Sequence, residues 1–217
     1  STPLYSSAAS DVYKRQGMEP WHASIQDAYE LLQGKKFEMQ NYPMWEKESL
    51  KDEEHPLAAY HVTEPFVLHT NKKEGESFKI EGRLLGGCLD CLSHLRGTKF
   101  DKVKEFNQKY EDDGILWFLE SCDLNVFEMR RTLWSLKQAG WFDTCRGFLI
   151  GRPGVQGQII AGLDQYEAVL SILSEFDVPI FMDLDIGHVA PMIPLICGSY
   201  GNCLLYTSPS PRDRSLS

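Results

Sequence analysis

The sequence predicts an α/β fold in which a partly parallel sheet carries flanking helices. Three apolar segments of strand length, 115–119, 144–151 and 178–182, alternate with two segments of helical periodicity, 125–139 and 162–175. Alternation at this spacing implies right-handed crossovers, which join parallel strands. Because the apolar runs are uninterrupted, we expect strands that are covered on both faces.

Length and composition restrict the class of protein. The chain has 217 residues, 42% of them hydrophobic, and a formal net charge of −9. This is the composition of a globular protein with one domain, or one and part of another. The negative charge argues against nucleic acid or an anionic membrane as a partner. The six cysteines lack framework spacing, and no secretory signal or membrane-length apolar run is visible, so we expect reduced thiols in a cytoplasmic protein.

The two ends of the chain differ from its interior. Residues 1–16 and 203–217 have no hydrophobic period, and both resemble translated sequencing-adaptor read-through. Disordered tails are the alternative interpretation. In either case we expect both flanks to stand outside the fold. If they are non-native, the natural protein is longer and this chain is a fragment of it.

Before the first long apolar run, the elements are short. Residues 24–32 predict a helix capped by Ser24, with Leu32 on its buried face. Short strands are predicted at 66–68 and 77–81.

A glycine-rich segment and a helix follow these strands. The segment 82–87, GRLLGG, matches neither a dinucleotide fingerprint nor a phosphate loop, so we interpret it as a close backbone approach. A helix is expected at 88–95, and the charged residues 99–113 are expected to be exposed. Trp117, Trp134 and Trp141 are predicted to be core residues.

Two polar residues that follow predicted strands suggest chemistry. Glu120 ends the run at 115–119, and His188 follows the run at 178–182. If the strands are parallel, both side chains emerge at the same edge of the sheet. A carboxylate beside a histidine is the orienting half of a nucleophile–histidine–acid triad, and Gly187 would leave space for a substrate.

The alternative for each residue is structural. Glu120 is then a solvated loop residue, and His188 is a turn histidine near Asp183 and Asp185.

The sequence contains no convincing nucleophile. It has no Gly-x-Ser-x-Gly elbow, and its interior serines lie in polar helices and loops. Cys122, beside Glu120, leaves a cysteine hydrolase as an open option.

Cys88 and Cys91 form a C-x-x-C pair, which suggests zinc or redox chemistry. A second pair with ligand spacing is missing, and the pair falls in an apolar helical stretch where cysteine acts as a small hydrophobic residue. We therefore expect neither a cofactor nor a metal.

Four segments carry a resemblance to a known family. They are IEGRLLGGCLDCLSHLRGT (80–98), GILWFLESCD (114–123), MRRTLWSLKQAGWFDTCRGFLIGRPG (129–154) and PIFMDLDIGHVAPMIPLICG (179–198). Their order and spacing resemble the LD-carboxypeptidase family of serine peptidases, and within it the microcin C immunity branch. In that family a serine from an N-terminal α/β domain works with a glutamate and a histidine from the C-terminal domain. The matching residues here are Glu120 and His188.

The resemblance implies a domain organisation. Residues 17–45 correspond to the tail of the N-terminal α/β domain, 46–65 to a linker, and 66–202 to the C-terminal β/α domain of the LD-carboxypeptidase fold. The chain then supplies the Glu and His of a Ser-His-Glu triad and lacks the Ser, so by itself it is expected to be inactive.

The implied substrate is a peptide or a peptidyl-nucleotide with an amide next to a carboxylate or an acyl-adenylate-like group. A different class of function stays open, in which a non-catalytic domain binds peptidoglycan fragments or self-associates through residues 82–97, for example as a homodimer.

Overall fold

A computed structural model describes residues 20–73 and 77–206 of the chain. These residues divide into two compact units. The first reaches Phe66 and also includes Val189–Leu195, whereas the second includes Val67–His188 and resumes at Ile196. The predicted domain boundaries stay a prediction. Within the described residues, every helix is too short or too polar to cross a membrane.

The second unit is built on a six-stranded mixed sheet with the order β3-β7-β6-β5-β4-β8. The four central strands are parallel, and the edge strands β3 and β8 are antiparallel to their neighbours. The α/β fold with a partly parallel sheet is therefore confirmed. The strands are β3 (His69–Thr70), β4 (Ser77–Cys88), β5 (Ile115–Glu120), β6 (Cys145–Gly151), β7 (Ile180–Leu184) and β8 (Tyr200–Tyr206).

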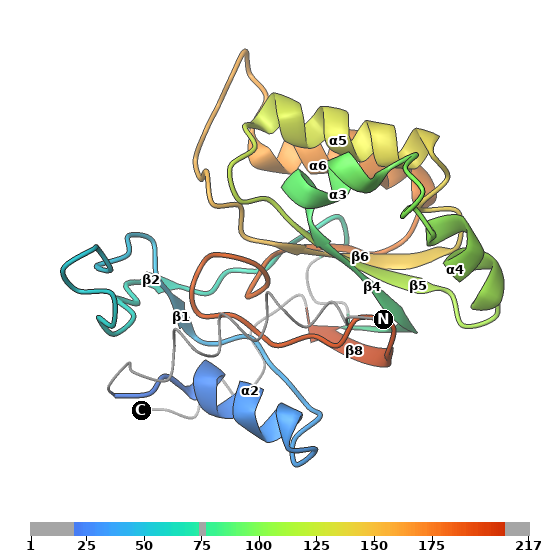
Figure 1. Cartoon of the computed structure of the whole chain (residues 1–217). Coiled ribbons are helices and arrows are strands. Elements are labelled where there is room, and N and C mark those ends of the chain that lie inside the picture. Colours follow the sequence, from blue (N-terminus) through green and yellow to red (C-terminus); the bar gives the residue numbers. More distant parts are fainter. Residues whose placement is uncertain (1–19, 74–76, 207–217) are drawn as a thin grey trace. The chain divides into compact units, whose positions relative to one another are not determined.

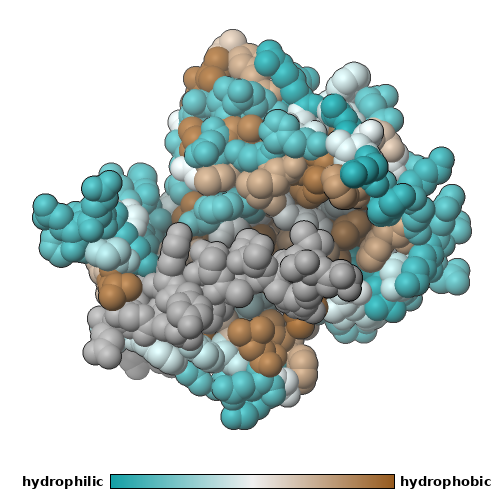
Figure 2. Space-filling model, in the orientation of Figure 1, coloured by the Kyte–Doolittle hydropathy of each residue, from teal (hydrophilic) through white to brown (hydrophobic). Residues whose placement is uncertain are grey.

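Helices cover one face of this sheet (Figure 1). The helical elements are α3 (Leu89–Leu95), α4 (Val103–Lys109), α5 (Val126–Gln138), α6 (Gln165–Leu173) and the 3-10 helix η1 (Ser174–Phe176). The main core lies between helices and strands, and alternate strand residues such as Ile115, Trp117 and Leu119 belong to it. Figure 2 shows that the outer surface of the helices is mainly hydrophilic, with isolated hydrophobic residues.

Helix α5 shows how local sequence sets this layer. Asn125 caps it, and Asn125 and Glu128 form a reciprocal capping box. Met129 and Leu133 are buried one turn apart, as the periodicity predicts. Trp134, predicted to be core, is instead 53% exposed, because it lies next to Leu133 and so points away from the sheet.

The charged stretch 99–113 contains a helix that the sequence did not predict. This helix, α4, is mostly exposed, as expected, but Val103 and Phe106 pack against the main core. Only two turns long, it stays close to the sheet through this apolar pair.

The glycine-rich segment lies inside β4, where it makes the predicted close approach. Gly86 has φ +155°, and a Cβ there would meet the carbonyl oxygen of Phe118 at 1.7 Å. Any other residue would push β4 away from β5. β8 pairs with β4 from Ser77 to Arg83 and β5 pairs with it from Arg83 to Cys88, so β4 is an internal strand of the sheet.

Two expectations about short elements are wrong. Residues 66–68 form no strand; β2 (Glu64–Pro65) and β3 lie on either side of them. Residues 203–206, which we expected to stand outside the fold, continue β8 and pair with β4 from Ser77 to Ile80. Their backbone completes a ladder whatever their origin. The remaining flank residues, 1–16 and 207–217, lie outside the described part of the chain.

The first unit contains helix α2 (Ala23–Leu32) and a two-stranded sheet formed by β1 (Met44–Trp45) and β2. His22, not Ser24, caps α2, since its Nδ1 accepts a hydrogen bond from the Ser24 backbone N–H. Leu32, expected on the buried face, is 70% exposed because the helix ends there.

A buried ion pair joins the ends of two neighbouring strands. Arg152 directly follows β6 and is 3% exposed, and Asp185 directly follows β7 and is fully buried. The Arg152 guanidinium donates to the Asp185 carboxylate. Since both charges are removed from water, each depends on the other for compensation.

Replacing Asp185 tests this dependence. Asp185→Ala should lower the free energy of unfolding by about 3 kcal/mol, because it leaves the Arg152 charge buried without its carboxylate. Urea denaturation followed by circular dichroism measures the change. Glu105→Gln, which removes an exposed partner of Lys102, is the matched control and should leave the midpoint almost unchanged. Equal midpoints for the two variants would contradict the assigned role of the buried pair.

Candidate active site

The candidate site lies where the parallel strands end. Cys88 is the last residue of β4 and Glu120 is the last residue of β5, and the two are paired in register. Glu120 is 4% exposed although its side chain is polar. A carboxylate of this kind is stable only where hydrogen-bond donors or cations satisfy it.

His188 provides a hydrogen-bond partner for the Glu120 carboxylate. Its Nδ1 atom lies 3.0 Å from both oxygens of the Glu120 carboxylate, across 68 residues of sequence. The His188 side chain is 56% exposed, so this ring joins a buried carboxylate to the surface. With Nδ1 held by Glu120, Nε2 is the ring nitrogen that would accept a proton from a nucleophile.

Two glycines make room for the Glu120 side chain. Gly187 has φ +105°, and a Cβ there would lie 2.4 Å from Cγ of Glu120. At Gly151, a Cβ would meet the carbonyl oxygen of Ile186 at 2.0 Å and Cβ of Glu120 at 3.1 Å. We expected Gly187 to leave space for a substrate; the space beside it is filled by Glu120. Glycine at position 187 is therefore explained by its close packing against the Glu120 side chain.

The two aspartates that precede His188 have partners of their own. Asp183 accepts hydrogen bonds from Tyr166 and Gln165, and it also lies 2.6 Å from Nδ1 of His69. Asp185 pairs with Arg152. The structural alternative for His188, a turn histidine beside these aspartates, is thus weaker than the pair with Glu120.

The residues that directly follow Glu120 are poor nucleophiles. Ser121 is 1% exposed, and its hydroxyl has no hydrogen-bond partner among the described residues. Burial and the nearby carboxylates of Asp123, Glu120 and Asp90 raise the pKa of the Cys122 thiol to about 11. A thiol that stays protonated near neutral pH is a weak nucleophile, which argues against a cysteine hydrolase.

Asp90, in the first turn of α3, fixes the loop after Glu120. Its two carboxylate oxygens accept hydrogen bonds from the backbone N–H groups of Cys122 and Asp123, at 3.0 and 2.9 Å. Although burial opposes it, these bonds hold the pKa of Asp90 below its ordinary value. Asp90 was not predicted as a site residue, because nothing in the sequence around it indicates a contact with a residue 32 positions away.

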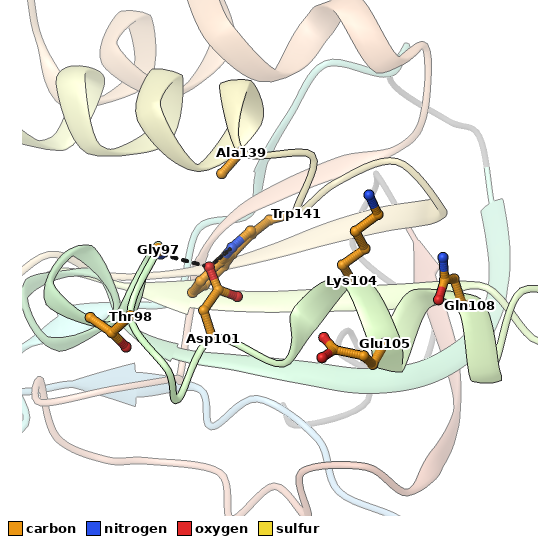
Figure 3. A pocket seen from close by; sticks show the side chains of 8 residues that line it. All are labelled: Gly97, Thr98, Asp101, Lys104, Glu105, Gln108, Ala139 and Trp141. Atoms are coloured by element: carbon orange, nitrogen blue, oxygen red, sulfur yellow. Dashed lines mark hydrogen bonds between the residues drawn. The ribbon is translucent and has the colours of Figure 1, made fainter.

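A separate hollow of 360 Å³ lies beside α4 (Figure 3). Oδ2 of Asp101 accepts hydrogen bonds there from the Gly97 backbone and from Nε1 of Trp141, at 2.8 and 3.1 Å. Its lining contains neither histidine nor cysteine. The carboxylate holds a turn against a core tryptophan, so we interpret the hollow as structural.

Comparison with known proteins assigns the family. The profile of the LD-carboxypeptidase C-terminal domain matches residues 81–202, more than half of the chain. The chain therefore belongs to the LD-carboxypeptidase family, as the four sequence segments indicate. The matched region includes β5, β6, β7 and most of β4, and it contains Glu120 and His188.

Curated relatives are longer than this chain. A Vibrio cholerae protein named as a carboxypeptidase is 21% identical over 70% of this chain and 43% of its own length. The microcin C7 self-immunity protein MccF of Escherichia coli is 25% identical over 56% of this chain and 33% of its own length. The chain thus spans less than half of either relative.

Solved structures share the fold. An MccF-like protein from Streptococcus pneumoniae, in complex with AMP, superposes with a TM-score of 0.64 at 21% identity, over 86% of this chain and 56% of its own. MccF in complex with glutamyl sulfamoyl guanosine has a TM-score of 0.63 at 19% identity, over 86% and 54%. At this identity the likeness shows the fold alone.

A glycine pair tests whether Gly187 is required for packing against Glu120. Gly157 also has a positive φ, +65°, but a Cβ there would have nothing within 4 Å. Gly157→Ala should therefore cost only backbone strain, about 1 kcal/mol of unfolding free energy. Gly187→Ala should cost about 2 kcal/mol more, because φ +105° is more strained for alanine than +65° and because the new Cβ overpacks Glu120. Chemical denaturation of both variants measures the difference, and equal losses would show that Glu120 does not fill this space.

The anchoring role of Asp90 predicts a pH dependence. Since its pKa is lower in the folded chain, its contribution to stability is present above its ordinary pKa of about 4 and is lost as pH falls below that value. Asp90→Asn should therefore lower the unfolding free energy by about 1 kcal/mol at pH 7. The difference from the unsubstituted chain should shrink towards pH 3. Urea titrations at several pH values measure it, and a difference that grows on acidification would contradict the assignment.

Proposed function

We propose that this chain supplies the acid and the base of a Ser-His-Glu hydrolase of the LD-carboxypeptidase type. The observation that carries the proposal is the contact of His188 Nδ1 with both oxygens of buried Glu120. The two residues lie on loops or strand ends at the edge where α/β proteins usually place their chemistry. Glu120 and His188 are also the positions that match the family's glutamate and histidine.

The geometry supports a different role for each of the two residues. Glu120 holds the Nδ1–H tautomer of His188 and stabilises the imidazolium that forms during the reaction. His188 then accepts the serine proton at Nε2 and returns it to the leaving amine. Because Glu120 is buried, its charge acts on the imidazole with little screening by solvent.

The nucleophile and the oxyanion donors are proposed to belong to an N-terminal domain outside this sequence. Both curated relatives extend well beyond the matched region. In the proposed organisation, residues 17–45 are the tail of that domain, 46–65 link it to the C-terminal domain, and the native protein is cytoplasmic.

The relatives' names support a proposal for the substrate class. One solved MccF structure is in complex with aspartyl sulfamoyl adenosine, and the Vibrio cholerae relative is named as a carboxypeptidase. We therefore propose a peptide or a peptidyl-nucleotide, cleaved at an amide next to a carboxylate or an acyl-adenylate-like group.

Extension of the chain by its upstream coding sequence provides the test. The extended protein should hydrolyse an L,D-tetrapeptide or an aminoacyl sulfamoyl-nucleotide, and Glu120→Gln or His188→Ala should each lower kcat/KM about a thousandfold or more. Exposed Glu167→Gln and His94→Gln are matched controls that should keep the activity. Amine release measures the rates.

The chain alone should show no hydrolysis under the same conditions. Hydrolysis by the 217-residue chain would contradict the assignment of the nucleophile to another segment. Full activity of Glu120→Gln or His188→Ala in the extended protein would contradict the triad itself.

A further inference from the structure

The Glu120–His188 pair has a third neighbour that triad chemistry does not need. Ligand atoms of Cys88, Glu120 and His188 all lie within 4.8 Å of one another. The arrangement follows from topology, because Cys88 and Glu120 are paired in register at the ends of two parallel strands. Paired residues on neighbouring strands place their side chains on the same face of the sheet.

We propose that Cys88, Glu120 and His188 form a binding site for a zinc-like divalent cation. Thiolate, imidazole and carboxylate are the side chains that bind Zn²⁺, and three of them leave a fourth position open. A sulfur ligand also disfavours Mg²⁺ and Ca²⁺, which prefer oxygen alone.

The distances are close to those that zinc requires. Two light ligand atoms of a tetrahedral zinc centre lie about 3.3 Å apart, and a sulfur and a light atom about 3.6 Å. The His188–Glu120 separation is already 3.0 Å. Closing the remaining separations, none above 4.8 Å, requires movements of about an ångström.

The surroundings suit a cation. Glu120 is buried and held in place by its contacts with Gly187, so one ligand is preorganised. His188 is exposed, so its ring can turn onto an ion that arrives from solvent. Sγ of Cys88 donates a hydrogen bond of 3.3 Å to Oδ2 of Asp90, and burial together with the Glu120 carboxylate raises the pKa of the Cys88 thiol, so a cation that binds there must displace this proton. Cys88 gives up its proton to solvent when the cation binds.

This site differs from the C-x-x-C pair in the sequence. Cys91 is exposed on α3 and does not belong to the cluster. The other two proposed ligands, Glu120 and His188, lie 32 and 100 positions further along the chain, and only the fold brings them close to Cys88.

If the proposed function holds, binding of the cation would also affect hydrolysis. A cation bound between His188 and Glu120 breaks the contact that orients the His188 imidazole to accept the serine proton. Metal binding and hydrolysis then exclude each other, so Zn²⁺ would inhibit the complete enzyme and a chelator would restore it.

The test uses the untagged 217-residue chain with Zn²⁺ and Co²⁺ as probes. Competition with a chromophoric chelator should give one Zn²⁺ per chain, and Co²⁺ should produce a thiolate-to-metal charge-transfer band. Cys88→Ser should abolish the band and weaken Zn²⁺ binding about a hundredfold, because the sulfur ligand is lost. Cys91→Ser, three residues further along in the first turn of α3, should keep both.

His188→Gln and a fold control complete the experiment. His188→Gln should keep a weaker band, and the urea midpoints of all metal-free variants should show that they fold. An unchanged band in Cys88→Ser, or an equal loss in Cys91→Ser, would overturn the site. If the extended protein needs Glu120 and His188 for hydrolysis but the chain gives no band, the proposed function stands and the metal site is wrong.

Discussion

The contact between Glu120 and His188 depends on the parallel alignment of β5 and β7. Each strand is separated from the next by a helix that packs on the same face of the sheet, so their carboxyl ends meet at one edge. The core supplies the rigidity, since Trp117, Leu133 and Phe148 are fully buried. The buried polar groups at this edge therefore have fixed positions relative to one another.

The loops at this edge pack against each other through backbone. Gly151 and Gly187 allow the segment after β7 to touch both β6 and Glu120. Gly154 lies so close to Cys122 that a Cβ on it would be 2.3 Å from the Cys122 carbonyl oxygen. Asp90 adds hydrogen bonds from α3. A buried carboxylate is costly, and this close packing limits the ways in which water could reach it.

The same edge holds the residues of both proposed chemistries. A carboxylate can orient an imidazole as a general base, and the two groups with a neighbouring thiol are also side chains that bind zinc. Which of these chemistries dominates depends on groups that share the edge with Glu120. Cys88 matters here because it occupies the end of the strand next to β5.

Much of the second unit could be predicted from the sequence. The apolar runs and helical periodicities identified β5, α5, β6, α6 and β7, because burial on both faces or on one stripe leaves a direct pattern in the residues. Short or irregular elements were harder to predict from the sequence. α4 has one apolar pair in a charged stretch, and β8 carries no period because backbone pairing with β4 is sufficient to form it.

The sequence by itself determined the fold class, the family and the two residues, Glu120 and His188, that follow apolar strands. Only the tertiary structure decided what surrounds them. That Gly187 packs against Glu120, that Asp185 pairs with Arg152, and that Cys88 joins the edge are consequences of strand register. Register depends on contacts between distant segments, such as the approach of Gly86 to Phe118, and a local pattern does not encode those contacts.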